Sequence, residues 1–200
     1  MSEAKNWKIQ PWRVEQSDEI ENYRIFKLRR EVASSPNGEK RAEFYVLDSP
    51  DWVNVIPVTP RGEIVMVGQY RHGSRQISLE TPAGLIEPHE SVEDAATREL
   101  REETGYTAQR YTLLGSTLAN PAFMTNRFTA VLAEDVMLTD PTKWDEHEEL
   151  EIKLVPVDDV PDMLARGDVV NSFAALALSW FLLHRHNILP ATGSRGTESA

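Results

Sequence analysis

GLIEPHESVEDAATRELREETGY, residues 84–106, holds most of the chain's reactive side chains in one predicted loop and one predicted helix. Ser91 is a favoured N-cap residue, and Asp94 follows three positions later, close to the pattern of a capping box. Gly105 stands where a residue in the left-handed conformation ends a helix. The stretch therefore predicts a loop followed by a helix over residues 92–104.

One face of this predicted helix is apolar. At 100° per residue one stripe collects Val92, Ala95, Ala96 and Leu100. Glu99 and Glu103 fall inside the same stripe, where a carboxylate is costly unless a cation or hydrogen bonds compensate it. Spaced i, i+4, they lie about 5–6 Å apart at Cβ and can share one hard divalent ion. Because the chain has no cysteine and no histidine pair at helical spacing, the pattern indicates Mg²⁺ or Mn²⁺ rather than zinc.

A glutamate-rich helix has a second interpretation, as a solvated surface held by ion pairs. Arg98 and Glu102 are spaced i, i+4 and fit it well. This interpretation leaves the two glutamates of the apolar stripe unexplained.

Composition places the chain among globular proteins. Of its 200 residues, 40% are hydrophobic and 26% charged, which is ordinary for one domain or one domain with an extension. No apolar run approaches a membrane span, and the first ten residues lack the apolar core of a secretory signal. The chain has no cysteine, which excludes disulfides and thiolate catalysis. We therefore expect a cytoplasmic protein with no membrane partner.

The formal net charge of −11 restricts the partners further. A nucleic-acid interface would need a basic patch, so no nucleic-acid partner is expected. An anionic substrate would have to be held by metal ions and a few arginines that reverse the local field.

Strand patterns occur on both sides of the predicted helix. Residues 23–30 and 40–47 flank a turn-like SSPNG at 34–38 and predict a hairpin with one solvated face. Further strands are predicted at residues 53–58, 63–70, 77–81, 111–117, 127–134 and 150–157.

Helical patterns return near the end of the chain, at residues 160–167 and 171–184. Residues 187–200 are small and polar and are expected to form a disordered tail. Strands, one capped helix, more strands and a terminal helix predict an α/β fold, in which helices cover a mixed sheet.

The quoted stretch matches the Nudix box, G-x5-E-x7-R-E-U-x-E-E-x-G-U, in which U is a bulky aliphatic residue. The matching residues are Gly84, Glu90, Arg98, Glu99, Leu100, Glu102, Glu103 and Gly105. The chain thus resembles the Nudix hydrolase family, with Tyr106 in a usually aliphatic position as a mild departure. The resemblance implies a Nudix α/β/α sandwich over residues 50–186 and an N-terminal antiparallel β extension over residues 1–49.

Short motifs outside the box narrow the resemblance. QYR at 69–71, ETPAG at 80–84, Pro121 and DEHEELEI at 145–152 look like the ADP-ribose pyrophosphatase branch of the family. That branch cleaves the pyrophosphate of nucleoside diphosphate sugars to a nucleoside monophosphate and a sugar phosphate. Its members use an N-terminal β element to form a dimer, so the resemblance implies a homodimer built through residues 1–49.

The resemblance also implies roles for single residues around a metal. Glu99, Glu103 and the main-chain carbonyl of Ala83 match the ligands of Mg²⁺, for which Mn²⁺ is a substitute. Glu102 is a candidate for a second metal site or for catalysis. Arg98 matches the arginine that orients these carboxylates, a role that suits its fixed fork.

Substrate-binding roles follow in the same way. Arg71 matches an arginine that contacts a substrate phosphate, and Glu80 and Pro121 match residues that line the site. Judged from the residues alone, Arg71 is equally well a charge at the surface end of a strand, and Glu80 could simply face water.

Hydrolysis also needs a group that takes the proton of the attacking water. Glu146 and Glu148, in the acidic loop before the last predicted strand, match glutamates that include the proposed base, and Glu146 ranks first. An ordinary acidic loop is the alternative. His72, His89 and His147 fit no pattern and are interpreted as surface residues.

The substrate stays open at this point. NPAFMTNR at 120–127 departs from the SPGxxxE pattern of the branch at Ala122 and Asn126. GDP-mannose or another sugar nucleotide is therefore an alternative to ADP-ribose. A non-catalytic Nudix-like nucleotide sensor is the alternative of a different class, although the intact carboxylates argue against it. Trp12 and Trp52 are candidates for stacking on a base, with packing in a core or interface as the other interpretation.

Overall fold

The computed structural model describes residues 8–144 and 149–188 and divides the chain into two compact units. The first unit holds the chain up to Pro50 together with Leu118–Asn126. The second holds Asp51–Thr117 and the chain from Arg127 onward. Residues 118–126 therefore belong with the N-terminal segment, although some seventy positions separate them from Pro50 in the sequence.

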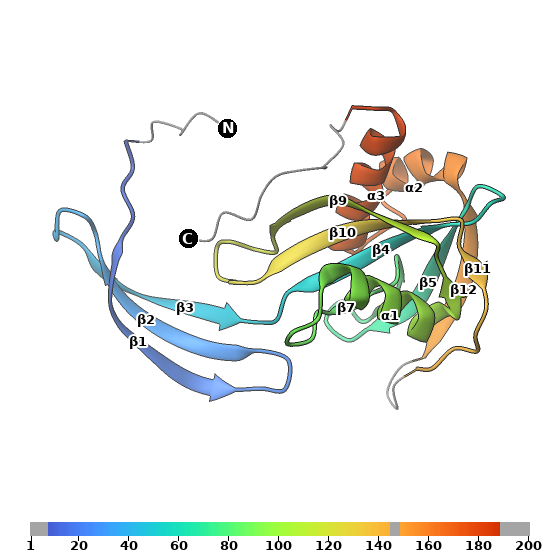
Figure 1. The fold of residues 1–200 in the computed structure, drawn as a ribbon. Coiled ribbons are helices and arrows are strands. Elements are labelled where there is room, and N and C mark those ends of the chain that lie inside the picture. Colours follow the sequence, from blue (N-terminus) through green and yellow to red (C-terminus); the bar gives the residue numbers. More distant parts are fainter. Residues whose placement is uncertain (1–7, 145–148, 189–200) are drawn as a thin grey trace. The chain divides into compact units, whose positions relative to one another are not determined.

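The first unit contains an antiparallel sheet of three strands, labelled in Figure 1. They are β1 (Arg13–Asn22), β2 (Lys27–Ser34) and β3 (Arg41–Asp48). β2 and β3 form the predicted hairpin, in register from Lys27 opposite Asp48 to Ser34 opposite Arg41. The first hairpin strand begins at Lys27 rather than at Tyr23, because the N–H of Tyr23 closes a turn onto the carbonyl of Phe26 at 2.8 Å.

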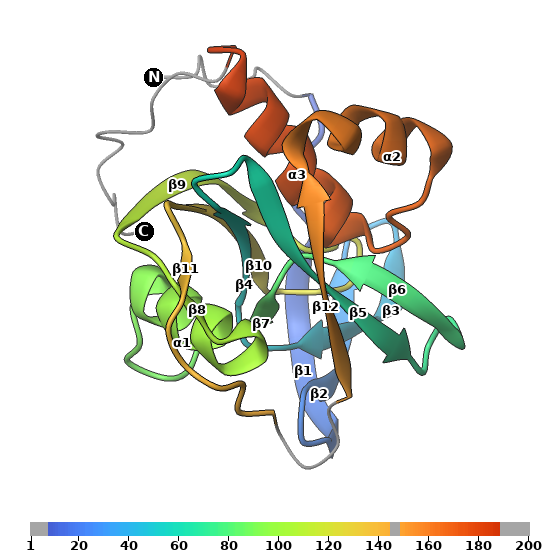
Figure 2. The ribbon, with the colours of Figure 1, turned by 90° about the vertical axis from the view of Figure 1, so that its right-hand side faces the viewer.

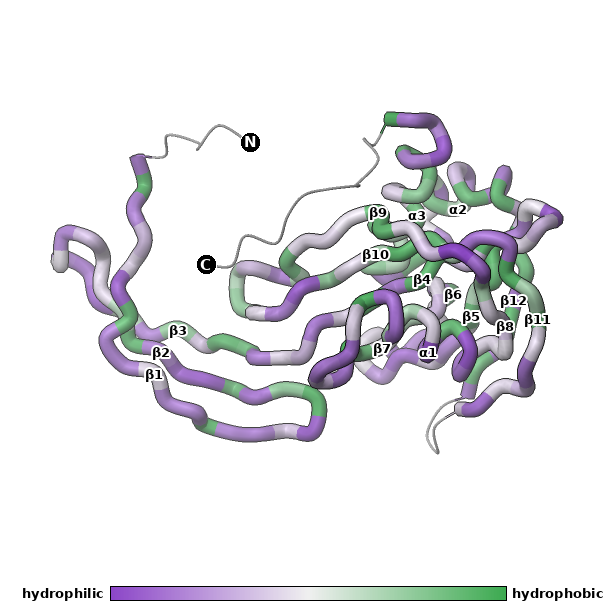
Figure 3. The backbone as a smooth tube through the Cα atoms, viewed as in Figure 1, coloured by the Kyte–Doolittle hydropathy of each residue, from purple (hydrophilic) through white to green (hydrophobic). Residues whose placement is uncertain are grey.

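β1 was not predicted from the sequence. Every one of its residues except Asp18 is exposed, so no alternation of apolar and polar side chains marks it as a strand. It pairs with β2 through two register shifts. Figure 3 shows the mostly hydrophilic colour of β1 and β2 against the hydrophobic colour that runs along β4, β5 and β10.

The second unit is built on a seven-stranded mixed sheet. Its strands are β4 (Trp52–Val58), β5 (Glu63–Arg71), β6 (Gln76–Glu80), β7 (Ala83–Leu85), β9 (Arg110–Leu118), β10 (Arg127–Glu134) and β12 (Leu150–Pro156). The main order is β12-β5-β4-β10-β9, with β6 paired to β5 and β7 paired to β4. β10 and β4 run parallel, whereas β12, β6 and β7 pair antiparallel with their neighbours.

Helices cover both faces of this sheet, as Figure 2 shows. The helices are α1 (Val92–Thr104), α2 (Val160–Arg166), which follows a short 3-10 turn at Val157–Asp159, and α3 (Ser172–Arg185). α1 lies on one face, and α2 and α3 lie on the other. The predicted α/β/α sandwich is therefore confirmed. Two short strands, β8 (Tyr106–Thr107) and β11 (Met137–Leu138), pair with each other beside the end of α1.

Successive residues of the central strands supply two separate cores. Val53 and Val55 of β4 pack in the cluster on the α1 side, whereas Ile56 joins the cluster under α3. Because neighbouring side chains of a strand point to opposite faces, a strand buried on both faces is apolar throughout. This is why residues 53–58 are apolar apart from Asn54.

The ends of α1 agree with the prediction. The hydroxyl of Ser91 accepts a hydrogen bond from the N–H of Asp94 at 3.1 Å, and Gly105 is left-handed with φ 74°. A β-carbon at Gly105 would also overlap the carbonyl of Asp140, so a glycine is needed there for two reasons. Among the described residues no helix is long and apolar enough to cross a membrane.

Candidate active site

The carboxylates of α1 pack against the main chain of β7. Glu103 is buried, with 6% of its surface exposed, and its Oε2 accepts a hydrogen bond from the N–H of Ala83 at 3.1 Å. The carboxylate of Glu99 lies directly against Gly84, where a β-carbon would overlap it. Both predicted helical ligands therefore face the short strand that carries the predicted carbonyl ligand.

Arg98 connects α1 to the loop before it. Its Nε and Nη2 donate to the two carboxylate oxygens of Glu90, each at 2.9 Å, and Nη2 also donates to the carbonyl of Leu85 at 2.9 Å. Nη1 donates to Oε1 of Glu99 at 2.6 Å and lies 3.5 Å from Oε2 of Glu102. The bidentate contact thus goes to Glu90, and Glu99 receives a single charge-assisted hydrogen bond.

Electrostatics keep Arg98 and Glu90 ionised. Hydrogen bonding to Glu90 raises the pKa of Arg98 and outweighs the opposite effect of burial, with Glu99 adding to the increase. The same hydrogen bond from Arg98 lowers the pKa of Glu90. Arg98 is therefore a fixed cation that orients Glu99 toward β7.

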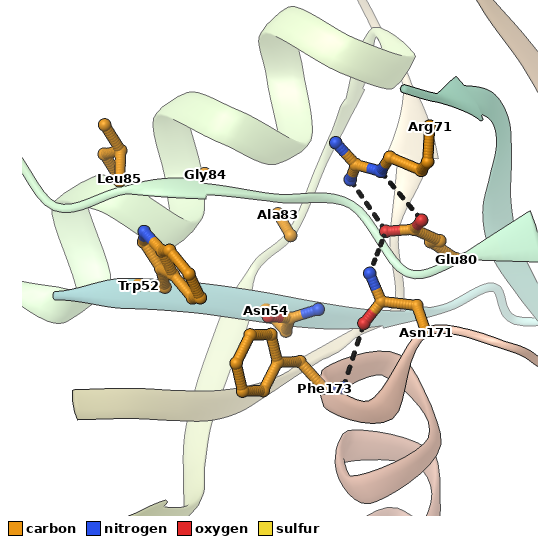
Figure 4. Close-up of a pocket in the computed structure, with 9 residues that line it drawn as sticks. All are labelled: Trp52, Asn54, Arg71, Glu80, Ala83, Gly84, Leu85, Asn171 and Phe173. Atoms are coloured by element: carbon orange, nitrogen blue, oxygen red, sulfur yellow. Dashed lines mark hydrogen bonds and ion pairs between the residues drawn. The ribbon is translucent and has the colours of Figure 1, made fainter. Parts of the chain in front are cut away.

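A second ion pair joins Arg71, the last residue of β5, to Glu80, the last residue of β6 (Figure 4). Arg71 donates from Nε and Nη2 to Oε1 and Oε2 of Glu80 at 2.9 and 2.7 Å. Nδ2 of Asn171, just before α3, donates to the same Oε2 at 2.7 Å. Glu80 is 1% exposed, so the interpretation in which it faces water is wrong.

The pKa of Glu80 is lowered although the group is buried. Burial is the largest influence and raises the pKa, but the hydrogen bonds and charge of Arg71, helped by Asn171, outweigh it. Glu80 is therefore a buried anion, and the side chain of Arg71 above it is 43% exposed.

These groups surround a cavity of ≈ 230 Å³ (Figure 4). It is lined by Trp52, Asn54, Arg71, Glu80, Ala83, Gly84, Leu85, Asn171 and Phe173. Trp52 and Phe173 form an aromatic wall, with ring centroids 5.0 Å apart and planes at 67°. Since Ala83 and Gly84 line the cavity and also contact Glu103 and Glu99, the cavity and the α1 carboxylates meet at β7.

The donor atoms at β7 and α1 fit a hard divalent cation. Glu99, Glu102, Glu103 and the carbonyl of Ala83 offer only oxygen, which Mg²⁺ and Mn²⁺ prefer. Within residues 8–144 and 149–188, no three acidic or histidine side chains are close enough to hold an ion by themselves. Mg²⁺ commonly takes one or two carboxylates and keeps several waters, so a main-chain carbonyl and water complete a suitable set.

The remaining candidate residues from the sequence lie in different parts of the chain. Pro121 is exposed in the first unit, and Glu146, Glu148 and His147 lie outside the described residues. His72 is exposed with its ring against Tyr70, and His89 is exposed with φ 72°. Trp12 contacts Phe44 edge-on in the first unit, and Trp52 is the tryptophan that lines the cavity.

Asn54, Leu85, Asn171 and Phe173 line the cavity but were not singled out from the sequence. Asn171 carries a local signal that was missed, since an asparagine before an apolar helical run is a favoured N-cap. Its bond to Glu80 spans 91 positions and has no signal in a single sequence.

Comparison with known proteins gives consistent matches. The NUDIX domain family matches residues 49–173. The ADP-ribose pyrophosphatase of Bacillus subtilis (strain 168) is 32% identical over 83% of this chain and 90% of its own length. The methanol dehydrogenase activator of Bacillus methanolicus is 27% identical over 84% of this chain and 90% of its own. Among solved structures, one titled as an ADP compounds hydrolase matches with a TM-score of 0.80 and 24% identity over 92% of this chain and 100% of that chain.

Proposed function

Because the chain belongs to the Nudix hydrolase family, we propose that it hydrolyses the pyrophosphate bond of ADP-ribose or a related nucleoside diphosphate sugar, with Mg²⁺ as cofactor. The products are a nucleoside monophosphate and a sugar phosphate. One observation carries the proposal: β7 lies between the carboxylates of α1 and a cavity that offers a guanidinium and an aromatic wall.

The cavity suits a substrate that has an anionic group and, at some distance from it, a planar ring. The guanidinium of Arg71 matches the geometry of phosphate oxygens. Trp52 and Phe173 present ring surface, on which a base or sugar can pack. The name of the B. subtilis relative, ADP-ribose pyrophosphatase, supports ADP-ribose as the first substrate to test.

In the proposed mechanism Glu99, Glu103 and the Ala83 carbonyl would hold the metal, and Glu102 would take part in a second site. When bound, Mg²⁺ neutralises phosphate oxygens and lowers the pKa of an attacking water. Arg98 keeps Glu99 oriented through its hydrogen bond at 2.6 Å.

Binding the substrate and accepting the proton of the attacking water are proposed to be the roles of different residues. Arg71 binds a phosphate, with Glu80 fixed beneath it. Glu146, or in second place Glu148, accepts the proton of the attacking water as general base. Pro121 is proposed to line the substrate site.

We further propose that residues 1–49 form a dimer interface in a cytoplasmic homodimer. The strand sheet of the first unit exposes apolar side chains, among them Val14, Ile20, Phe44 and Tyr45. A small sheet is stabilised when its apolar side chains pack against another surface, and a symmetric partner would supply such a surface.

A substrate panel tests the proposed function. ADP-ribose, ADP-glucose, GDP-mannose, UDP-glucose and a dinucleoside polyphosphate are incubated with the full chain, with and without Mg²⁺, and ranked by kcat/KM. We expect Mg²⁺-dependent release of a nucleoside monophosphate, with ADP-ribose or another sugar nucleotide ranked first. Tight binding of a nucleotide without turnover of any compound would contradict the proposal and favour a sensor.

A further inference from the structure

We propose that Asn171 is a positioning residue, which ties the start of α3 to Glu80 and thereby fixes the guanidinium of Arg71 for a substrate phosphate. The proposal that a phosphate is the ligand rests on the proposed function. The coupling of Asn171 to Arg71 through Glu80 stands on the geometry alone.

Both polar atoms of the Asn171 side-chain amide make hydrogen bonds. Its Oδ1 accepts hydrogen bonds from the N–H groups of Phe173 at 2.9 Å and Ala174 at 3.2 Å, which caps α3. Its Nδ2 donates to Oε2 of Glu80 at 2.7 Å. Aspartate and serine cap a helix about as well as asparagine does. The amide nitrogen is therefore the feature that capping alone does not require.

Glu80 transmits this contact to the cavity. Its Oε2 receives hydrogen bonds from both Asn171 and Arg71, each at 2.7 Å, while Oε1 receives Nε of Arg71 at 2.9 Å. A buried carboxylate that accepts hydrogen bonds from three donors is held in one orientation. The guanidinium of Arg71, which binds this carboxylate through two nitrogens, is then held in one orientation as well. Without the Asn171 bond, Glu80 would depend more on its contact to Arg71, a side chain that is itself partly exposed.

The same turn also places the aromatic wall. Phe173 follows two residues after Asn171, meets Trp52 edge-on, and stacks on Phe128 with centroids 5.1 Å apart at 15°. The first turn of α3 is thus anchored in the core by the stacking of Phe173 on Phe128. At the cavity it is anchored by the amide of Asn171, which Figure 4 shows. Asn171 keeps the phosphate-binding cation and the ring surface in fixed relation.

Asn171→Asp separates positioning from capping. The aspartate keeps the cap acceptor but removes the donor and places a second carboxylate against Glu80. We expect kcat/KM for ADP-ribose to fall about tenfold or more, mainly through KM, since a charge-assisted hydrogen bond is lost. Asn171→Ser keeps a cap without the reach to Glu80 and should show a smaller fall in the same direction. Asn37→Asp, the same change at an exposed turn, serves as the control and should leave both constants unchanged.

A double-variant cycle tests the route through Arg71. In an Arg71→Ala background, Asn171→Asp should change kcat/KM by less than about twofold, because the group it positions is gone. A full tenfold effect in that background would overturn the proposal. Unchanged kinetics of Asn171→Asp in the wild-type background would overturn it as well.

A spectroscopic measurement separates this proposal from the proposed function. The ¹⁵N resonance of the Arg71 Nε–H, assigned by its loss in Arg71→Ala, should shift or broaden in Asn171→Asp and stay unchanged in Asn37→Asp. If the wild-type chain hydrolysed no sugar nucleotide, the proposed function would fail while this signal still reported the coupling. An unperturbed Arg71 signal in Asn171→Asp would overturn the positioning role whatever the activity.

Discussion

Gly84 and Glu99 are in direct contact, so close that a β-carbon at residue 84 would overlap the Glu99 carboxylate. The contact brings the α1 carboxylates to the β7 main chain, which also carries the Ala83 carbonyl. Glycine is therefore required at residue 84 because the Glu99 carboxylate leaves no room for a side chain, and not because of a turn.

The first prediction concerns this contact. Gly84→Ala should displace Glu99 and raise the Mg²⁺ concentration needed for half-maximal activity about 10- to 100-fold, the range seen when groups around a metal are disturbed. Metal titration of initial rates measures it. Gly73→Ala is the matched control, since a β-carbon there meets nothing within 4 Å. Equal metal titrations of the two variants would contradict the assignment of Glu99.

The second prediction is a pH dependence of stability. The folded chain lowers the pKa of Glu80, so the ionised carboxylate stabilises the fold above its unfolded pKa, and this contribution is lost as pH falls through the folded pKa. Arg71→Ala removes the cation that lowers the pKa of Glu80. Burial, which raises this pKa, is then the main influence on it. The variant should therefore lose on the order of 1–3 kcal/mol at pH 7 and less at pH 4.

Urea unfolding of both proteins at the two pH values measures this difference. Comparing variant with wild type cancels the contributions of the other carboxylates. A loss that is equal at both pH values, or larger at pH 4, would show that Arg71 does not hold Glu80 ionised.

The third prediction assigns the base. Glu146→Gln should lower kcat about 10²- to 10⁴-fold and leave Mg²⁺ and substrate binding nearly unchanged, because a general base acts mainly in the transition state. Glu148→Gln is the comparison, and the two should not lose activity equally. If both variants stay within about threefold of wild type, the base lies elsewhere, and Glu102 is the next residue to test.

The fourth prediction is the oligomeric state. Light scattering of the full chain at micromolar concentration should give a particle of two chains. Ile20→Lys or Phe44→Lys should weaken the dimer if the exposed apolar side chains of the first unit are buried in it. A monodisperse wild-type monomer would rule out the proposed interface.

Local signals explain what the sequence could predict. Ser91 and Gly105 fix the ends of α1 through bonds within a few residues. The predominance of apolar residues in β4 and β10 reflects burial on both faces. β1 was missed because it is exposed on both faces, so its apolar and polar residues do not alternate. β7 was missed because a strand of three residues is too short to show a periodic pattern of hydrophobicity.

The cavity was only partly predictable, for a different reason. Motifs identified Arg71 and Glu80, but not that they bind each other at the ends of two paired strands. Asn171 and Phe173 enter from a helix 91 and more positions away, and only the packing of α3 on the sheet brings them there. Contacts of this kind depend on tertiary structure and have no counterpart in local spacing.

Turnover of ADP-ribose by Glu103→Gln at saturating Mg²⁺ tests the central claim most directly, because Glu103 is the buried carboxylate of α1 that contacts β7. Products are quantified as nucleoside monophosphate, with the circular dichroism of the variant checked against wild type. Loss of a hard oxygen ligand should lower kcat by at least about a hundredfold in a folded protein. Turnover near that of the wild type would contradict the account.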